Sequence, residues 1–247
     1  MLKSAKELLI SEKKYTFGEE TDRTSKAFMR DMIPNSQIGL ALDLGCGTGL
    51  NARAIQKMGY AIKGIDLSPT AIEKFRQNGF DGEVCDLSAA IPYEDSIFDF
   101  VYASEVIEHL EDPEGFLSEI SRVLKPGGKL LISTPNSAFW VYRVYALLGK
   151  TLTEVQHPGH ISFFSKISFL SAIRKANFDI EVESGRNIFF IAFGLVGKFL
   201  AWISFDFVFN SEERFKTKKV FWHISAKSRR INGFWTDTMI VLARNSK

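Results

Sequence analysis

The sequence predicts an α/β fold, with a mostly parallel sheet that carries helices on both faces. From residue 38 onward, apolar runs typical of buried strands alternate with helical patterns. A glycine-rich turn, Gly45 to Gly49, joins the first apolar run to the first helix, and the next two runs end in carboxylates, Asp66 and Asp86. Such alternation forms right-handed crossovers, which align the strands in parallel and place ligands at their carboxyl ends.

The first half of the chain follows this pattern in order. Residues 3–33 are expected to form one or two charged amphipathic helices, which end at Pro34. The expected strands are 38–44, 60–65, 81–85, 97–103 and 129–134, and the expected helices are 49–58, 69–77 and 113–124.

The second half is less regular. Residues 136–164 are a long insert rich in aromatic side chains, after which a helix at 165–176 and a strand at 178–184 resume the pattern. The last strand is expected at 236–243. Because no clear crossover helix separates the last two strands, we expect them to form an antiparallel pair at the sheet edge.

The composition fits a single domain of 247 residues. Residues 1–37 are expected to cap it, 38–135 to form its core, and the inserts 136–164 and 187–232 to cover one face. A net charge of +2 lacks the basic footprint of nucleic-acid binding, so we expect no nucleic-acid partner.

The cysteine content favours a reducing compartment. Cys46 and Cys85 are the two cysteines, too few for a disulfide framework. Residues 1–14 are charged and lack the apolar core of a signal peptide. A cytoplasmic protein is therefore expected.

The glycine-rich turn is the first candidate site. Glycine lets the backbone approach a ligand closely because it has no Cβ atom, and the N–H groups that begin the next helix face that ligand. Asp66, about 20 residues after the turn, could accept hydrogen bonds from both hydroxyls of a ribose. The alternative is that Asp66 caps the helix that starts near Pro69. Asp86 could accept a hydrogen bond from the exocyclic amine of an adenine.

A nicotinamide dehydrogenase is the main rival for such a pattern. Its fingerprint is G-x-G-x-x-G, with the third glycine inside the helix. Here the spacing is G-x-G-x-G, and Leu50 follows. The spacing therefore argues against a dehydrogenase.

Four motifs, in order, resemble those of the class I S-adenosylmethionine-dependent methyltransferases. They are Leu42-Asp-Leu-Gly-Cys-Gly-Thr-Gly49, Gly64-Ile-Asp-Leu-Ser68, Phe98-Asp-Phe-Val-Tyr-Ala-Ser-Glu105 and Leu124-Lys-Pro-Gly-Gly-Lys-Leu-Leu-Ile-Ser133. The pattern is most similar to that of the ubiquinone-type O-methyltransferases and the broad group around them. The resemblance implies a Rossmann-like, seven-stranded sheet whose last strand is antiparallel.

The resemblance also implies a site for S-adenosyl-L-methionine, which leaves as S-adenosyl-L-homocysteine. The glycine turn would pass under the methionine part, Asp66 would hold the ribose, Asp86 with Leu87 would hold the adenine, and the backbone of Ser104 would line the sulfonium. The residues expected to bind the cofactor are Asp43, Gly45, Cys46, Gly47, Thr48, Gly49, Asp66, Leu67, Asp86, Leu87, Ser104 and Glu105.

Three of the four histidines are candidate catalytic residues. A hydroxyl acceptor needs a base as well as alignment with the methyl group, and His109, His157 and His160 could supply one. The loop from His157 to Ser165 is expected to lie over the acceptor pocket. The alternative for His160 is a structural bond that holds this loop.

The pentapeptide Glu105-Val-Ile-Glu-His109 follows the fourth strand. In ubiquinone-type relatives the matching Glu, Glu and His are associated with magnesium. Carboxylate oxygens suit that ion, but histidine is an unusual ligand for it. We therefore expect no metal, with Mg²⁺ as the alternative and a structural role for Glu108 and His109 as another.

The two inserts predict an apolar acceptor. Both leave the carboxyl ends of strands and are rich in aromatic residues, as expected of a pocket for a small or lipid-like molecule. Methylation at oxygen is the expected reaction. The alternative is a non-catalytic partner or scaffold protein that binds the cofactor and docks through its aromatic insert.

The apolar segment 188–209 raises the question of a membrane. Lys198 and Asp206 interrupt it, which argues against a transmembrane helix. A helix here would be either a buried lid or a helix in a membrane interface, and the basic residues that follow would favour anionic lipid.

Overall fold

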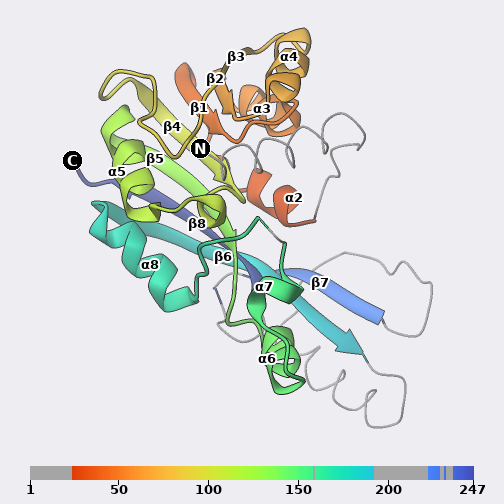
Figure 1. Ribbon diagram of the computed structural model, residues 1–247. Coiled ribbons are helices and arrows are strands. Elements are labelled where there is room, and N and C mark those ends of the chain that lie inside the picture. The colour runs from red at the N-terminus through yellow and green to blue at the C-terminus, as the bar shows by residue number, and fades with distance from the viewer. Residues whose placement is uncertain (1–23, 158, 192–221, 229–230, 232–235) are drawn as a thin grey trace.

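The computed structural model describes residues 24–157, 159–191, 222–228, 231 and 236–247. One sheet of eight described strands runs through the molecule in the order β3-β2-β1-β4-β5-β8-β6-β7 (Figure 1). The strands are β1 (Gly39–Leu44), β2 (Tyr60–Asp66), β3 (Asp81–Val84), β4 (Phe98–Ser104), β5 (Leu124–Pro135), β6 (Phe178–Ile191), β7 (Trp222–Ser228) and β8 (Thr236–Asn245). The first five pair in parallel, whereas β8 is antiparallel to both β5 and β6.

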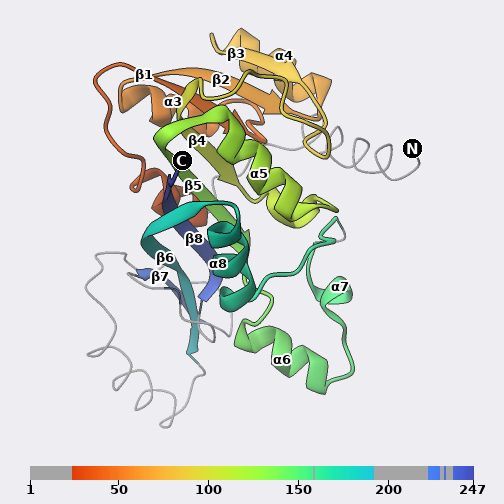
Figure 2. The ribbon, with the colours of Figure 1, turned by 90° about the vertical axis from the view of Figure 1, so that its left-hand side faces the viewer.

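Helices cover both faces of this sheet. They are α2 (Thr24–Arg30), α3 (Leu50–Lys57), α4 (Pro69–Gln77), α5 (Pro113–Val123) and α8 (Lys166–Lys175). Two further helices, α6 (Trp140–Leu147) and α7 (Leu152–Val155), lie in the connection from β5 to α8 and bury none of their residues. On one face, Met29 of α2 and Ile55 of α3 pack with Tyr102 in one apolar cluster. On the other face, Leu117 of α5 and Phe169 of α8 belong to the main core cluster (Figure 2). Burial on both faces explains the near-continuous apolar strands.

The bounds of the strands and helices predicted between residues 38 and 124 are confirmed to within about two residues, whereas β5 begins at Leu124 rather than at the predicted residue 129. Local chemistry explains this agreement. Ser68 caps α4 by accepting a hydrogen bond from the Ala71 amide at 3.0 Å, and Asp112 caps α5 by accepting one from Gly115 at 2.9 Å. A proline follows each cap, where its fixed φ suits the first helical turn. Of the predicted N-terminal helices, Thr24–Arg30 is described, and residues 1–23 lie outside the described residues.

Two polar side chains connect the strands. The carboxylate of Asp99 accepts a hydrogen bond from the Leu40 amide at 2.9 Å and one from Lys125 Nζ at 2.8 Å, joining β4 to the start of β1 and to β5. The buried amide of Asn245, at the end of β8, donates to the Ser121 carbonyl at 3.0 Å. These bonds satisfy groups that burial would otherwise penalise.

The second half confirms part of the prediction and corrects part. Strands β6 and β8 form the predicted antiparallel pair. The pair does not lie at the sheet edge, because β8 is inserted between β5 and β6, and β7 covers the far side of β6. The seven expected strands are all present. Strand β7 is an addition, and it falls inside the predicted insert 187–232.

Strand β6 is longer than predicted. The prediction ended it at residue 184 and placed residues 188–191 in the apolar segment that was considered as a helix. The strand instead continues to Ile191, because residues 185–191 pair with residues 222–228 of β7. A short apolar run does not by itself distinguish a strand from a helix. The rest of the segment, residues 192–209, lies outside the described residues, and so does the choice between a lid and a membrane-interface helix.

In the described part of the chain, none of the helices combines the length and the apolar character that a bilayer span requires.

Candidate active site

The glycine turn follows β1 and bends back over the end of β2. Gly45, Gly47 and Gly49 have φ of 69°, 55° and 95°, which is the left-handed region that favours glycine. A Cβ atom on Gly45 would lie 2.7 Å from Cγ2 of Val106, so space as well as conformation requires glycine there. The amides of Gly45 and Cys46 both donate to the Ile65 carbonyl, at 2.8 and 3.0 Å.

Asp66 lies directly against this turn. Its carboxylate accepts hydrogen bonds from the amides of Gly47 at 3.0 Å and Ser68 at 2.9 Å, and the residue is 6% exposed. The structure thus brings Asp66 and the glycine turn into direct contact, and their shared role in one binding site stays a prediction. The alternative that Asp66 caps α4 is wrong, because Ser68 is the capping residue.

The other residues of the turn have distinct surroundings. Asp43 is 1% exposed on β1, in register with Tyr102 of β4. Burial, and then the charge of Asp43, raise the pKa of Tyr102, so its phenol keeps its proton. The side chain of Cys46 packs in a small apolar cluster with Phe75. The carbonyl of Thr48 accepts a hydrogen bond from Asn78 at 2.9 Å.

Asp86 follows the neighbouring strand, β3. The Cys85 amide donates to the Asp66 carbonyl at 3.1 Å, which holds the ends of β2 and β3 side by side. The half-buried carboxylate of Asp86 accepts a hydrogen bond from the Ser88 amide at 2.9 Å. Leu87 is buried in the main core cluster, and Leu67 is half-buried after β2. The two predicted carboxylates therefore end adjacent strands at one edge of the sheet.

Glu105, directly after β4, has an unusual backbone. Its φ is 57°, a left-handed conformation that a residue with a side chain rarely adopts. Its amide donates to the Ser133 carbonyl at 3.2 Å, and Ser133 Oγ donates to its carboxylate at 3.3 Å and lies 3.4 Å from Ser104 Oγ. Strained residues of this kind cluster at functional sites.

Glu108 is almost completely buried, at 1% exposure. Thr134 Oγ1 donates to its Oε2 at 3.1 Å, and its Oε1 lies 4.0 Å from Nε2 of His160. Its backbone carbonyl accepts hydrogen bonds from Ile161 and Ser162, at 2.9 and 3.0 Å. Glu108 therefore anchors the histidine-containing loop to the strand ends.

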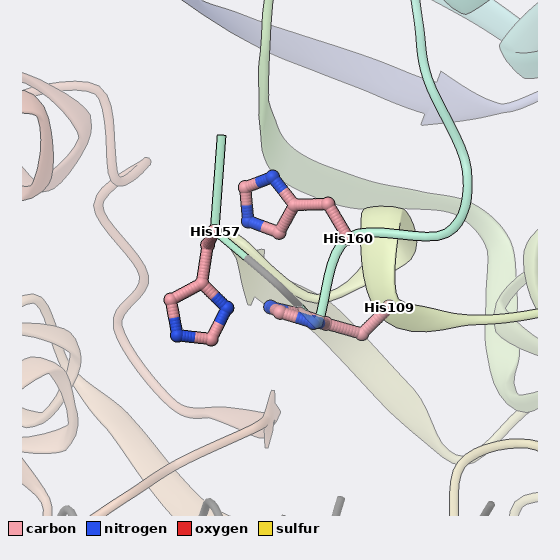
Figure 3. Close-up of side chains that lie close together, drawn as sticks. All are labelled: His109, His157 and His160. Carbon is pink, nitrogen blue, oxygen red and sulfur yellow. The ribbon is translucent and has the colours of Figure 1, made fainter. Parts of the chain in front are cut away.

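The three predicted histidines come together. His109 ends a 3₁₀ turn, Ile107–His109, and His157 and His160 lie in the loop between α7 and α8. Figure 3 shows their imidazole rings grouped around one point, with ring centroids 5.0 to 5.8 Å apart. His109 Nδ1 lies 2.9 Å from the Gly159 carbonyl, and His160 Nδ1 lies 3.1 Å from Gln156 Oε1.

The structure adds an ion pair that the sequence did not predict. Nε of Arg186, on β6, donates to both carboxylate oxygens of Asp237, on β8, at 3.0 Å each. Nη2 of Arg186 also donates to Oδ2 of Asp237. Although burial lowers the pKa of Arg186, Asp237 holds it above its ordinary value. Tyr142 of α6 lies in the same group: burial raises its pKa, and the charges of Asp237 and Glu105 raise it further.

No sequence signal marks this group. Arg186 and Asp237 are 51 residues apart, and the antiparallel register of β6 and β8 brings them together. A separate surface hollow of about 500 Å³ is lined by α8 residues from Lys166 to Lys175 and includes none of the predicted site residues.

The fold is one that known proteins share. The core sheet order, the antiparallel β8 and the helices on both faces are those of class I Rossmann-like methyltransferases. Residues 42–132 match the family model described as a methyltransferase domain. The match confirms the resemblance that the four motifs predicted.

Individual proteins show the same likeness. Over 156 residues the chain is 34% identical to a ubiquinone biosynthesis O-methyltransferase of Xanthomonas oryzae pv. oryzae, covering 58% of this chain and 64% of that protein, which is less than two thirds of its length. A SAM-dependent methyltransferase of Thermotoga maritima superposes with a TM-score of 0.60 at 20% identity, over 98% of this chain and 94% of that one. The [4+2]-cyclase SpnF superposes with a TM-score of 0.55 at 18% identity, over 99% and 94%. Since a cyclase shares the fold, the fold alone does not define the reaction.

Proposed function

We propose that this chain transfers a methyl group from S-adenosyl-L-methionine to an oxygen atom of a small, lipid-like acceptor. The observation that carries the proposal is the bond between the Gly47 amide and the buried Asp66 carboxylate. It joins a turn of three glycines in the left-handed region to a carboxylate at the end of the next strand, the position from which an acid can hold a ribose. The match of residues 42–132 to a methyltransferase domain supports the same reading.

The residues present fit this cofactor. The glycine turn offers close backbone approach for the methionine part, because a Cβ at Gly45 would fill the space beside Val106. The Asp66 carboxylate accepts backbone hydrogen bonds from Gly47 and Ser68, which fix it at the end of β2, and we infer that it would also accept hydrogen bonds from the ribose hydroxyls. Asp86 and Leu87 would hold the adenine, and the Ser104 backbone would line the sulfonium. When bound, the cofactor supplies an electrophilic methyl group.

The protein supplies alignment and proton removal. We place the acceptor hydroxyl beside the histidine cluster, with His160 as the residue that receives its proton directly or through a neighbouring histidine. The buried carboxylate of Glu108, 4.0 Å from His160 Nε2, stabilises positive charge on that imidazole. His109 orients the loop through its bond to the Gly159 carbonyl.

Exposed apolar side chains on and next to α6 support a lipid-like acceptor. Tyr145 and Val144 are 43% and 44% exposed, and Leu147 and Leu148 are 87% and 72% exposed. Apolar surface of this kind marks a site for a lipid, a membrane or another protein. The X. oryzae relative is named for ubiquinone biosynthesis, in keeping with an acceptor of this class. Flotation with anionic liposomes tests whether the acceptor is met at a membrane.

Calorimetry with S-adenosyl-L-methionine tests the cofactor, and methyl release against quinols, catechols and sugar nucleotides tests the reaction. We expect binding of one cofactor per chain and turnover with at least one apolar hydroxyl compound. Absence of cofactor binding would overturn the proposal. Binding without transfer to any acceptor would favour a non-catalytic cofactor-binding protein.

A further inference from the structure

We propose that His109, His157 and His160 bind a divalent transition-metal ion of the zinc type. One ring nitrogen from each residue can be chosen so that all three lie within 4.8 Å of one another. Among the described residues, this is the group of three or more metal-binding side chains that the fold gathers. Figure 3 shows the three rings facing a common point from two segments, the turn after β4 and the loop before α8.

The hydrogen bonds of two rings set the tautomer that a metal requires. Nδ1 of His109 faces the Gly159 carbonyl at 2.9 Å, and Nδ1 of His160 faces Gln156 Oε1 at 3.1 Å. An oxygen acceptor requires a proton on the facing nitrogen, so in the neutral imidazole Nε2 keeps its lone pair. Metal-binding histidines show this arrangement, with the second nitrogen donating to a carbonyl or carboxylate oxygen.

The third ring also offers a lone pair. Nδ1 of His157 accepts a hydrogen bond from the Gly159 amide at 3.1 Å, so this nitrogen carries no proton. The side chain is exposed and can exchange that bond for a metal ligand by a small rotation. Gly159 thus connects the cluster, because its carbonyl faces His109 and its amide faces His157.

The site must contract slightly to hold the ion. Zinc–nitrogen bonds of about 2.0–2.1 Å in a tetrahedral site place the nitrogens roughly 3.4 Å apart, so separations of up to 4.8 Å must shorten by at most about 1.4 Å. The exposed loop that carries His157 can make this adjustment. Three histidines leave the fourth position open, as in catalytic zinc sites.

The ligand chemistry distinguishes this site from a magnesium site. Imidazole nitrogens suit zinc, nickel, copper and iron, whereas Mg²⁺ prefers oxygen. The magnesium alternative would use Glu105, Glu108 and His109, and the proposed site shares His109 with it. The carboxylate of Glu105 accepts a hydrogen bond from Ser133, and that of Glu108 accepts one from Thr134. The buried charge of Glu108 beside His160 offsets part of the charge of the ion.

A bound ion would occupy the lone pair with which His160 receives a proton in the proposed function, so the two roles belong to the metal-loaded and the metal-free chain. The test measures metal binding without cofactor. The full chain, free of any purification tag and treated with a chelator, is titrated with Zn²⁺ by calorimetry and with Co²⁺ by visible absorption. We expect one ion per chain and the intense visible absorption of tetrahedral cobalt. His157→Ala and His160→Ala should each weaken binding by at least about 10- to 100-fold, the loss that follows removal of an outer partner alone.

His223→Ala is the matched control, because it removes the fourth histidine, which lies on β7 outside the cluster. It should bind zinc as the wild type does, and excess Mg²⁺ should not displace the ion. The inference is overturned if the wild type binds no stoichiometric metal, or if both cluster variants bind as tightly as His223→Ala. His157 is exposed, so its variant remains informative should His160→Ala fail to fold. Calorimetry with S-adenosyl-L-methionine on the same samples separates failure of this site from failure of the proposed function.

Discussion

The two regions that we assign to the cofactor and to the acceptor hold their polar groups in different ways. On the cofactor side, backbone amides hold the carboxylates: Gly47 and Ser68 bond to Asp66, and Ser88 bonds to Asp86. On the acceptor side, side chains meet side chains from distant segments, as Arg186 meets Asp237. The first kind of site is set by local backbone geometry, and the second by how strands and loops pack. Motifs in the sequence therefore indicate the first kind of site, and they indicate single residues of the second, such as the histidines, but not pairs such as Arg186 and Asp237.

The largest effect is expected on the acceptor side, from His160→Ala. Loss of the group that receives the acceptor proton should lower turnover by about 100- to 10,000-fold. Cofactor affinity should stay unchanged, because His160 lies in the loop between α7 and α8, where its Nδ1 faces Gln156 of the same loop. Single-turnover methyl release and calorimetry measure the two quantities separately. Unchanged turnover would contradict the role of His160 as a base and would favour a structural role in the loop between α7 and α8.

On the cofactor side, Asp66→Ala should show the reverse pattern. Losing two charge-assisted hydrogen bonds to the ribose should cost about 2–4 kcal/mol, roughly 30- to 1,000-fold in Kd. Calorimetry with S-adenosyl-L-methionine measures the change. Asp81→Ala is the control, because that carboxylate forms a surface pair with Lys63 and should not affect binding. Wild-type affinity in Asp66→Ala would contradict the ribose assignment.

Gly45→Ala and Gly127→Ala compare two glycines with similar backbones. Their φ values are 69° and 75°, but a Cβ meets Val106 at 2.7 Å in the first case and open space in the second. Gly127→Ala should lose about 1 kcal/mol of stability for the left-handed backbone alone. Gly45→Ala should lose about 2–3 kcal/mol, because the clash adds to that strain. Urea unfolding measures both, and equal losses would mean that Val106 yields without cost.

Asp99→Asn should give the smallest effect. Burial alone would raise the pKa of Asp99, but hydrogen bonds from Leu40 and Lys125 outweigh it and hold the pKa below its ordinary value of 3.8. A lowered pKa stabilises the fold above pH 3.8, and this stability is lost as the pH falls through the folded-state pKa. The variant should lose about 0.5–1 kcal/mol at pH 7. The gap between wild type and variant should close in acid, and a gap independent of pH would exclude the charge as its cause.

The strengths and gaps of the sequence-based prediction follow the same division. Gly45, Asp66 and Asp86 were identified because strand ends and glycine turns impose their positions over short stretches of chain. Asp99 belongs to the motif Phe98–Glu105. Its hydrogen bonds to Leu40 and Lys125 connect β4 to β1 and β5, a role that the motif alone does not predict. Arg186 was missed because its partner depends on the register of β6 against β8. Residues 188–191 were assigned to the wrong kind of element because an apolar run suits a helix and a paired strand equally.

The insertion of β8 between β5 and β6 has a consequence for synthesis on the ribosome. This strand is translated after every other described strand. It nevertheless joins strands β1 to β5 to the antiparallel pair of β6 and β7. Until it emerges, β5 and β6 each present an open edge of unpaired backbone groups, the kind of surface that invites aggregation. A nascent chain arrested before residue 236 should therefore depend on chaperones, and closure of the whole sheet is a late event of translation.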